Sequence, residues 1–132
     1  MVGGNRGGVY YAMKGDEAKV VAAFCDWLRC EGWDVQTEVD YVDVVAERDG
    51  ERLLCEAKGA SSEVGLDVDF AYGQILRRMP EHDDPVVNYA IVVRDEPKSV
   101  SAARRVTRRV RELLRITLYA VSEDGQVREL LT

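Results

Sequence analysis

The chain has 132 residues, of which 46% are hydrophobic and 32% charged, and its formal net charge is −6. This size predicts one domain with a modest core. The start lacks the apolar core of a signal peptide and no apolar run could span a membrane, so we predict a cytoplasmic protein. The odd number of cysteines, without C-x-x-C spacing, indicates free thiols and argues against a structural zinc site.

Residues 1–14 are rich in glycine, which predicts a flexible N-terminal arm ahead of a single domain over residues 15–132. In this arm, Tyr10 and Tyr11 either stack on nucleic-acid bases or pack onto the sheet, and the sequence does not separate the two. Gly15-Asp16 begins a helix that runs to about Cys30 and ends at Glu31-Gly32. A strand over 33–39 follows. The expected core face of the helix recurs at helical spacing and comprises Val20, Ala23, Phe24, Trp27 and Leu28.

Two strand-like runs over 41–48 and 51–58 are joined by Asp49-Gly50, a strong signal for a two-residue hairpin turn. Such a turn pairs Arg48 with Glu51 and therefore places Asp43 opposite Glu56. Side chains alternate along a strand, so Lys58 shares the face of Glu56, whereas Cys55 and Ala57 point the other way. The hairpin therefore predicts two facing carboxylates with a lysine beside them.

The rest of the chain predicts two more helices and three more strands. A helix over 67–79 has its apolar stripe on Phe70, Ile75 and Met79. A buried strand over 86–93 follows, then a helix from Lys98 or Ser99 to about Leu114, a buried strand over 116–122 and a short edge strand over 126–130. The order αβββαβαβ predicts an α/β fold in which a mixed central sheet is flanked by helices on both faces. Trp33 and Phe70 are expected in the core with the other large aromatic residues.

Facing carboxylates about 5 Å apart repel each other unless a cation or a proton lies between them. A divalent metal ion is the simplest solution, and Lys58 could then orient or deprotonate a water. The ordinary alternative is an exposed strand face on which Glu56 and Lys58 form a salt bridge. That alternative does not explain Asp43 within the apolar run 42–46, because aspartate is depleted in strands.

Asp43, twelve intervening residues and Glu56-Ala57-Lys58, followed by Gly59, form a pattern that resembles the PD-(D/E)xK superfamily of restriction-endonuclease-like nucleases. Glu17 on the preceding helix and Gln74 on the following helix fit the same family pattern. The resemblance covers about Asp16 to Val121, and Val42 stands where the family's name has proline.

The resemblance implies a nuclease site that uses Mg²⁺ or Mn²⁺. Asp43 and Glu56 would bind the metal, helped by the Ala57 carbonyl and Glu17. Lys58 would orient a water or stabilise developing charge, and Gln74 would position Lys58 or a phosphate. The carboxylate of Glu17 also suits the first turn of a helix for electrostatic reasons alone, and Asp16 is an equal candidate by position.

Basic residues supply candidate phosphate contacts. Arg104, Arg108, Arg111 and Arg115 are spaced to line one face of the predicted third helix, where a solvated helix face is the commoner outcome and a phosphate grip the second interpretation. Arg77 and Arg78 lie closer to Gln74 and are expected to reach substrate phosphates. The only histidine, His82, lies in an acidic turn that gives no support to Ser-His-Asp or Cys-His catalysis.

We therefore predict a divalent-metal-dependent nuclease that hydrolyses DNA, with RNA left open, and with a homodimer or a separate targeting partner supplying reach. The alternative is a catalytically silent accessory module that keeps the nuclease fold and binds nucleic acid or protein. Residues 1–70 carry a net charge of −8 and residues 71–132 a net charge of +2, which lacks the usual basic footprint of a nucleic-acid-binding domain. The chain also has no recognisable DNA-recognition insertion.

Overall fold

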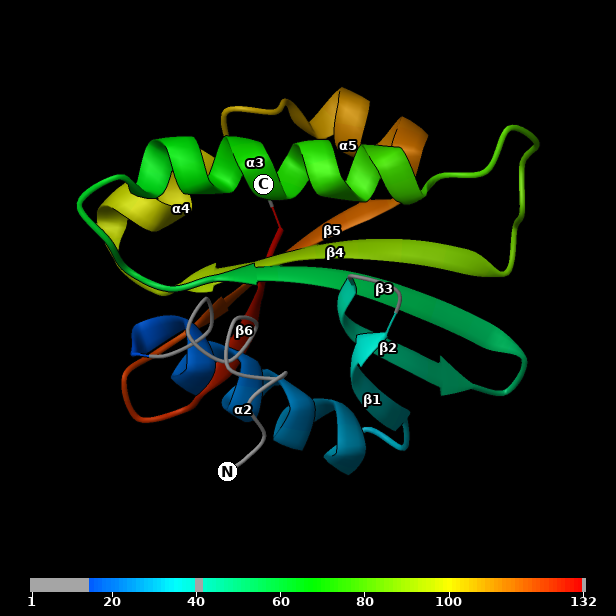
Figure 1. Cartoon of the computed structure of the whole chain (residues 1–132), viewed down its shortest axis with the longest axis horizontal. Helices are drawn as coiled ribbons and strands as arrows, with labels where there is room; N and C mark the ends of the chain where they lie inside the picture. Colours follow the sequence, from blue (N-terminus) through cyan, green and yellow to red (C-terminus); the bar gives the residue numbers. More distant parts are fainter. Residues whose placement is uncertain (1–14, 40–41, 132) are drawn as a thin grey trace, which may run out of the picture.

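The computed structural model describes residues 15–39 and 42–131, which form a six-stranded mixed sheet flanked by helices. Helix α2 (Asp16–Cys30) covers one face of the sheet, and α3 (Val64–Arg78), α4 (Pro97–Ala103) and α5 (Arg108–Leu114) cover the other (Figure 1). The strands are β1 (Asp34–Val39), β2 (Val42–Arg48), β3 (Glu51–Lys58), β4 (Val87–Arg94), β5 (Ile116–Val121) and β6 (Val127–Leu130). The predicted arm over residues 1–14, with Tyr10 and Tyr11, lies outside the described residues.

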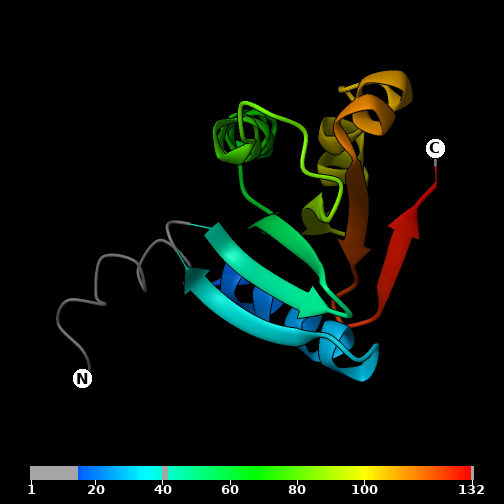
Figure 2. The ribbon, with the colours of Figure 1, turned by 90° about the vertical axis from the view of Figure 1, so that its right-hand side faces the viewer.

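The strands lie in the sheet in chain order, β1 to β6. The pairs β1–β2, β2–β3 and β5–β6 are antiparallel, whereas β3, β4 and β5 are mutually parallel. Figure 2 shows the twist that separates the β1–β3 end of the sheet from the β5–β6 end. Because β3, β4 and β5 are parallel, their carboxyl ends meet at one edge of the sheet, and this edge carries Lys58.

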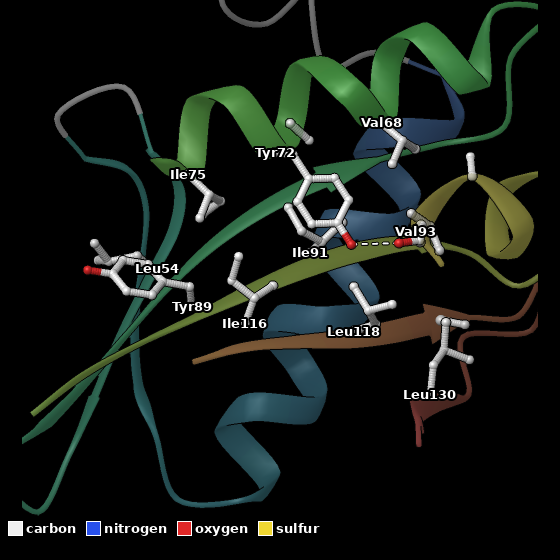
Figure 3. Packing of buried hydrophobic residues seen from close by; sticks show 14 of the residues in the cluster. Leu54, Val68, Tyr72, Ile75, Tyr89, Ile91, Val93, Ile116, Leu118 and Leu130 are labelled. Carbon is white, nitrogen blue, oxygen red and sulfur yellow. Dashed lines mark hydrogen bonds between the residues drawn. The ribbon is translucent and has the colours of Figure 1, made fainter. Parts of the chain in front are cut away.

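Each face of the sheet has its own apolar core. Val20, Phe24 and Leu28 of α2 pack against Cys55 and Val92 on one face. On the other face, α3 and α4 cover a second cluster that includes the side chains in Figure 3. Strand β4 is buried along nearly its whole length because it serves both cores, as the apolar run over 86–93 predicted.

The predicted hairpin is confirmed. Asp49 and Gly50 both have positive φ, at 53° and 83°, as a two-residue turn of the type favoured in hairpins requires. Arg48 pairs with Glu51, and the same register runs back to Val44 and Cys55. For the other strands, each predicted end lies within one residue of the end observed in the structure. Among the described residues, no helix is both long and apolar enough to cross a membrane.

Helix α3 begins at Val64, three residues before its predicted start, and its buried face differs from the predicted apolar stripe. The buried side chains are Val64, Val68, Ala71, Tyr72 and Ile75. Phe70 is 61% exposed, so its assignment to the core is wrong. The physical reason is helical phase, because position 70 lies almost opposite Val68, whose side chain is fully buried.

The single helix predicted between β4 and β5 is wrong, because the chain forms two short helices there. Glu96 caps α4 by accepting a hydrogen bond from the Ser99 amide at 2.7 Å, and Pro97 occupies the first turn. Thr107 has an extended backbone, which interrupts the helix before α5. The interruption shifts the helical phase, and the apolar side chains of Leu113 and Val110 on α5 are exposed, Leu113 by 70%.

The hydroxyl of Tyr72 connects α3 to α4 by donating a hydrogen bond to the Ala103 carbonyl at 2.6 Å (Figure 3). Tyr72→Phe removes this donor from a buried carbonyl, so we expect the free energy of unfolding to fall by about 1–2 kcal/mol. Urea denaturation measures the change. Tyr119→Phe is the matched control, because the Tyr119 hydroxyl forms no hydrogen bond with any described residue. For this variant we expect the free energy of unfolding to change by less than about 0.5 kcal/mol. Equal effects of the two substitutions would contradict this role for Tyr72.

Candidate active site

Asp43 and Glu56 lie on the neighbouring strands β2 and β3, one residue beyond the last pair of the ladder, Val44 and Cys55. The Ala57 amide donates a hydrogen bond to Asp43 Oδ2 at 2.9 Å, which holds the aspartate against β3. The backbone of Asp43 in turn hydrogen-bonds the Glu56 carboxylate. These contacts bring the two carboxyl groups together as the hairpin register predicted.

Glu56 is 1% exposed, and its Oε2 atom is buried without a hydrogen-bond partner among the described residues. Burial, helped by the nearby Asp43 carboxylate, raises the pKa of Glu56 to about 8, although the charges of Lys58 and Arg78 oppose the increase. At neutral pH the metal-free side chain therefore favours its protonated form. A buried carboxyl oxygen without a partner indicates a place where a proton, a cation or a ligand atom belongs.

Burial also raises the pKa of Asp43, although the Ala57 amide and the charge of Lys58 favour the ionised form. Two adjacent carboxyl groups with raised pKa values share protons readily and resist carrying two full charges. The electrostatic conflict predicted from the hairpin is thus present in the structure. It lies on the face of the sheet that α3 covers, the face on which Leu54 packs.

Lys58 and Glu17 complete the polar cluster at the carboxyl end of β3. The Lys58 Nζ and Glu17 Oε1 atoms are 3.9 Å apart, and both side chains are largely buried. Burial raises the pKa of Glu17 to about 7, opposed by Lys58 and increased by Asp43. Glu17 therefore lies within electrostatic reach of the Asp43–Glu56 pair.

Asp16, the equal candidate by position, has a different task. Its carboxylate accepts two hydrogen bonds from the buried Arg94 guanidinium, at 2.6 and 3.1 Å, and one from the Ala60 amide at 2.6 Å. The Arg94 hydrogen bond lowers the pKa of Asp16, so this carboxylate remains ionised and paired. Asp16 fixes the first turn of α2 to the ends of β3 and β4, and this contact places Glu17 beside Lys58.

Gly59 explains how α2 approaches so closely. A Cβ atom at this position would lie 2.4 Å from the Glu17 backbone nitrogen and 2.7 Å from the Asp16 carbonyl carbon. Such contacts are too short to exist, so only glycine allows the helix to begin directly against the end of β3. The residue after Lys58 therefore has a steric role in assembling the cluster.

Helix α3 contributes Gln74 and Arg78 to the same region. The Gln74 Oε1 atom is buried and accepts no hydrogen bond from any described residue. The charge of Arg78 lowers the pKa of Glu56, which places its guanidinium near that carboxylate. Arg77 is exposed on the outer side of α3. Of the two arginines predicted to reach phosphates, Arg78 therefore lies nearer the centre.

The predicted alignment of four arginines on one helix face is wrong, because the helix is interrupted. Arg104 is exposed at the end of α4, and Arg108 forms an ion pair with Glu112 at 3.0 Å. Arg111 is 6% exposed and donates to the Val106 carbonyl. Arg115 donates to the carbonyls of Val87 and Asp84. Two of the four side chains thus stabilise the fold, and only Arg104 and Arg108 remain at the surface.

Glu38 is a residue near the centre that the sequence analysis missed. The β1–β2 pairs Thr37–Val44 and Val39–Val42 enclose it, so it faces Asp43 from the other side, and its charge raises the Asp43 pKa. Its φ of 56° is unusual for glutamate. The short connection between Val39 and Val42 contained the signal, because it fixes a second hairpin register.

The donor set fits magnesium chemistry in one respect. Mg²⁺ is commonly held by one or two carboxylates, with waters and substrate phosphates as its other ligands. Asp43 and the partnerless oxygen of Glu56 supply such a pair. Within residues 15–39 and 42–131, however, no three acidic, histidine or cysteine side chains lie close enough to form a ready-made ligand set. The metal role assigned to Glu17 and the Ala57 carbonyl stays a prediction.

Comparisons with known proteins identify similar folds. No protein-family description matches the chain, and no curated protein matches it in sequence. The fold is similar to that of an XisH family protein from Nostoc punctiforme, with a TM-score of 0.55 and 16% identity over 85% of this chain and 98% of that one. It is also similar to a fdxN element excision controlling factor protein from Anabaena variabilis, with a TM-score of 0.52 and 13% identity over 87% and 99% of the two chains.

The steric role of Gly59 gives a prediction with an internal control. Gly59→Ala must push α2 away from β3, so we expect the free energy of unfolding to fall by at least about 2 kcal/mol. Gly73→Ala, in the interior of α3, adds a methyl group where no atom lies within 4 Å, and we expect a gain of about 0.5–1 kcal/mol. Urea denaturation measures both, and changes of the same sign would contradict the role of Gly59.

The raised pKa of Glu56 predicts how stability depends on pH. The folded protein keeps the Glu56 proton up to about pH 8, whereas the unfolded chain releases it near the ordinary value of 4.5. The contribution of Glu56 is therefore fully present below about pH 4.5 and is lost as pH rises toward 8, with a slope of up to about 1.4 kcal/mol per pH unit.

Glu56→Gln removes this titration while it keeps the shape of the side chain. In metal-free buffer, the unfolding free energy of the variant should therefore decline less between pH 5 and pH 8 than that of the unmodified protein. Urea denaturation at several pH values makes the comparison, and other titrating groups cancel in the difference. Parallel pH profiles would show that Glu56 is not protonated in the folded state.

Proposed function

We propose that this protein is a divalent-metal-dependent nuclease of the restriction-endonuclease-like type that hydrolyses DNA phosphodiester bonds. The observation that carries the proposal is the pair of partly buried Asp43 and buried Glu56, with Lys58 on the next position of the same strand face and a Glu56 oxygen that has no hydrogen-bond partner among the described residues. A structural salt bridge would not require two carboxyl groups to share one buried site. The arrangement is the one that the Asp43…Glu56-Ala57-Lys58 pattern predicts.

Asp43 and Glu56 would hold Mg²⁺ or Mn²⁺, with Glu17 and the Ala57 carbonyl as further candidates. When bound, such an ion polarises a phosphoryl oxygen and lowers the pKa of a coordinated water. Lys58 donates to the attacking water or to the charge that develops on the phosphate. Glu17, 3.9 Å from Lys58, keeps the ammonium oriented toward the centre. Gln74 positions Lys58 or a phosphate from the side of α3.

Nucleic acid would approach from the side of α3, α4 and α5. The charge of Arg78 acts on the Glu56 carboxylate, and Arg77, Arg104 and Arg108 are exposed on the same layer of helices. One similar structure is named for controlling the excision of the fdxN element, which we take to be a process on DNA. That name supports a nucleic-acid substrate here, with RNA as the variant to be tested. The small size favours a homodimer or a separate targeting partner.

Cleavage assays test the proposal directly. Plasmid, branched DNA and RNA are incubated with Mg²⁺ or Mn²⁺ and the unmodified protein, Asp43→Ala or Lys58→Ala. We expect cleavage by the unmodified protein and a loss of about a hundredfold or more in both variants, because each removes a group required in the transition state. Arg52→Ala is the control, since it removes an exposed cation at the far end of the same strand. Equal activity in all proteins would refute the proposal.

Asp43→Asn separates the metal site from folding. Asparagine keeps an acceptor for the Ala57 amide and removes the carboxylate that opposes ionisation of Glu56. In metal-free buffer we expect the melting temperature of this variant to be equal to or above that of the unmodified protein. Added Mg²⁺ should raise the melting temperature of the unmodified protein and leave the variant nearly unchanged. Equal stabilisation of both would show that Asp43 binds no metal.

The second candidate is an accessory module that binds nucleic acid or protein without cleaving. The acidic net charge favours it, as do the large apolar side chains exposed on α3, Leu66 and Phe70. Calorimetric titration separates the candidates. If millimolar Mg²⁺ and Mn²⁺ fail to bind while DNA or a protein partner binds measurably, the accessory role is correct.

A further inference from the structure

A hollow of about 470 Å³ lies between the first turn of α3 and α4, on the face of the sheet that also carries Asp43 and Glu56. Its lining combines the apolar or small residues Val64, Gly65, Pro97 and Ala102 with the hydroxyl and cationic side chains of Ser62, Ser101, Lys98 and Arg105, and none of the lining residues is acidic. Its chemistry suits an anion with several oxygen atoms.

We propose that this hollow binds a phosphate of a nucleic-acid backbone, on the same strand as the phosphate that the Asp43–Glu56 centre would cleave. The inference rests on the proposed function for the identity of the ligand, and the hollow itself is a separate site. Phosphodiester groups of DNA and of RNA share the chemistry that this lining recognises. The hollow would fix the position of the strand, while the acidic centre would act on it.

Lys98 and Arg105 make few strong contacts within the protein, so both side chains are available to a ligand. Lys98 is exposed and forms no ion pair with any described residue. Arg105 Nη2 donates to the Gly65 carbonyl at 3.1 Å and lies 3.7 Å from Asp69 Oδ1. Both side chains of that pair are more than half exposed, so water weakens their attraction and a phosphate can compete for the guanidinium.

The absence of a side chain at Gly65 allows this placement. A Cβ atom there would lie 2.8 Å from Arg105 Nη2, so glycine lets the guanidinium rest against the first turn of α3. No side chain caps the start of this 15-residue helix. Its first amide groups therefore add partial positive charge to that of Lys98 and Arg105.

The position of the hollow relates it to the acidic centre. Its walls follow β3 and β4, and ligands of open α/β sheets bind outside the carboxyl ends of such parallel strands. Ser62 is only four positions after Lys58, so their Cα atoms are at most about 14 Å apart. Phosphates of one duplex strand are about 3.4 Å apart along the axis, so both sites lie within about four nucleotides of one strand.

Binding measurements test the proposal without relying on cleavage. Fluorescence anisotropy in EDTA measures the Kd of labelled duplex DNA, and of RNA of the same length, at 50–200 mM salt, a range in which phosphate contacts are resolved. We expect Lys98→Ala to weaken binding several-fold, Lys98→Glu to weaken it more, and the slope of log K against log salt to fall by about one. Arg105→Ala should act in the same direction. Arg29→Ala, an exposed cation on α2 across the sheet, should change neither quantity.

The outcomes separate this inference from the proposed function. If Lys98→Glu binds DNA and RNA with the Kd and salt slope of the unmodified protein, the hollow is not a phosphate site, even where cleavage by the unmodified protein is intact. If substitution of Lys98 weakens binding while neither the unmodified protein nor any variant cleaves nucleic acid, the hollow is a phosphate site and the nuclease proposal fails. An unmodified protein that binds neither nucleic acid overturns both. Equal melting temperatures of the variants exclude unfolding as the cause.

Discussion

The register of the β2–β3 hairpin is the constraint on which the rest of the structure depends. Asp49 and Gly50 adopt positive φ, so the turn has two residues and the strands cannot slide. A shift by one residue would place Asp43 and Glu56 on opposite faces and remove the conflict between them. The fold instead keeps both carboxyl groups on one covered face, although the burial of Glu56 costs hydration energy that no hydrogen bond to its Oε2 offsets.

Two contacts outside the hairpin bring further polar side chains to the Asp43–Glu56 pair. The Asp16–Arg94 ion pair and the narrow space over Gly59 bring the first turn of α2 to the end of β3, so that Glu17 meets Lys58. Neither contact involves a group that would do chemistry. Their effect is to place Glu17 where it restricts the flexible side chain of Lys58. Supporting contacts of this kind hold the polar groups of a site in a defined geometry.

The parts of the structure that the sequence predicts well are those that local geometry decides. The turn at Asp49-Gly50, the bounds of the strands and the end of α2 all follow from short-range backbone preferences. Phe70 and the helix interruption were mispredicted because nonlocal contacts decide them. Packing against the sheet decides which residues of α3 face inward, and the hydrogen bond from Tyr72 to the Ala103 carbonyl joins α3 to α4. Glu38 was missed because its position opposite Asp43 becomes apparent only when the register of the β1–β2 pair is combined with that of the β2–β3 pair.

The acidic net charge and a phosphate ligand are compatible once the charges are placed in space. The formal charge counts Glu56 and Glu17 as ionised, yet burial raises their pKa values to about 8 and about 7, so the centre is less negative near neutral pH than the sequence implies. Lys58 and Arg78 face this centre, and their charges act on the Glu56 carboxylate. The other carboxylates are not confined to one side of the sheet, because Asp16, Asp26, Asp34 and Glu38 lie on α2 and β1, whereas Asp67 and Asp69 lie on α3. A strand that approaches along α3 and α4 would meet Lys98 and Arg105 as well as these two aspartates, and the carboxyl groups of Glu56 and Glu17 would release their protons only where a cation replaces them.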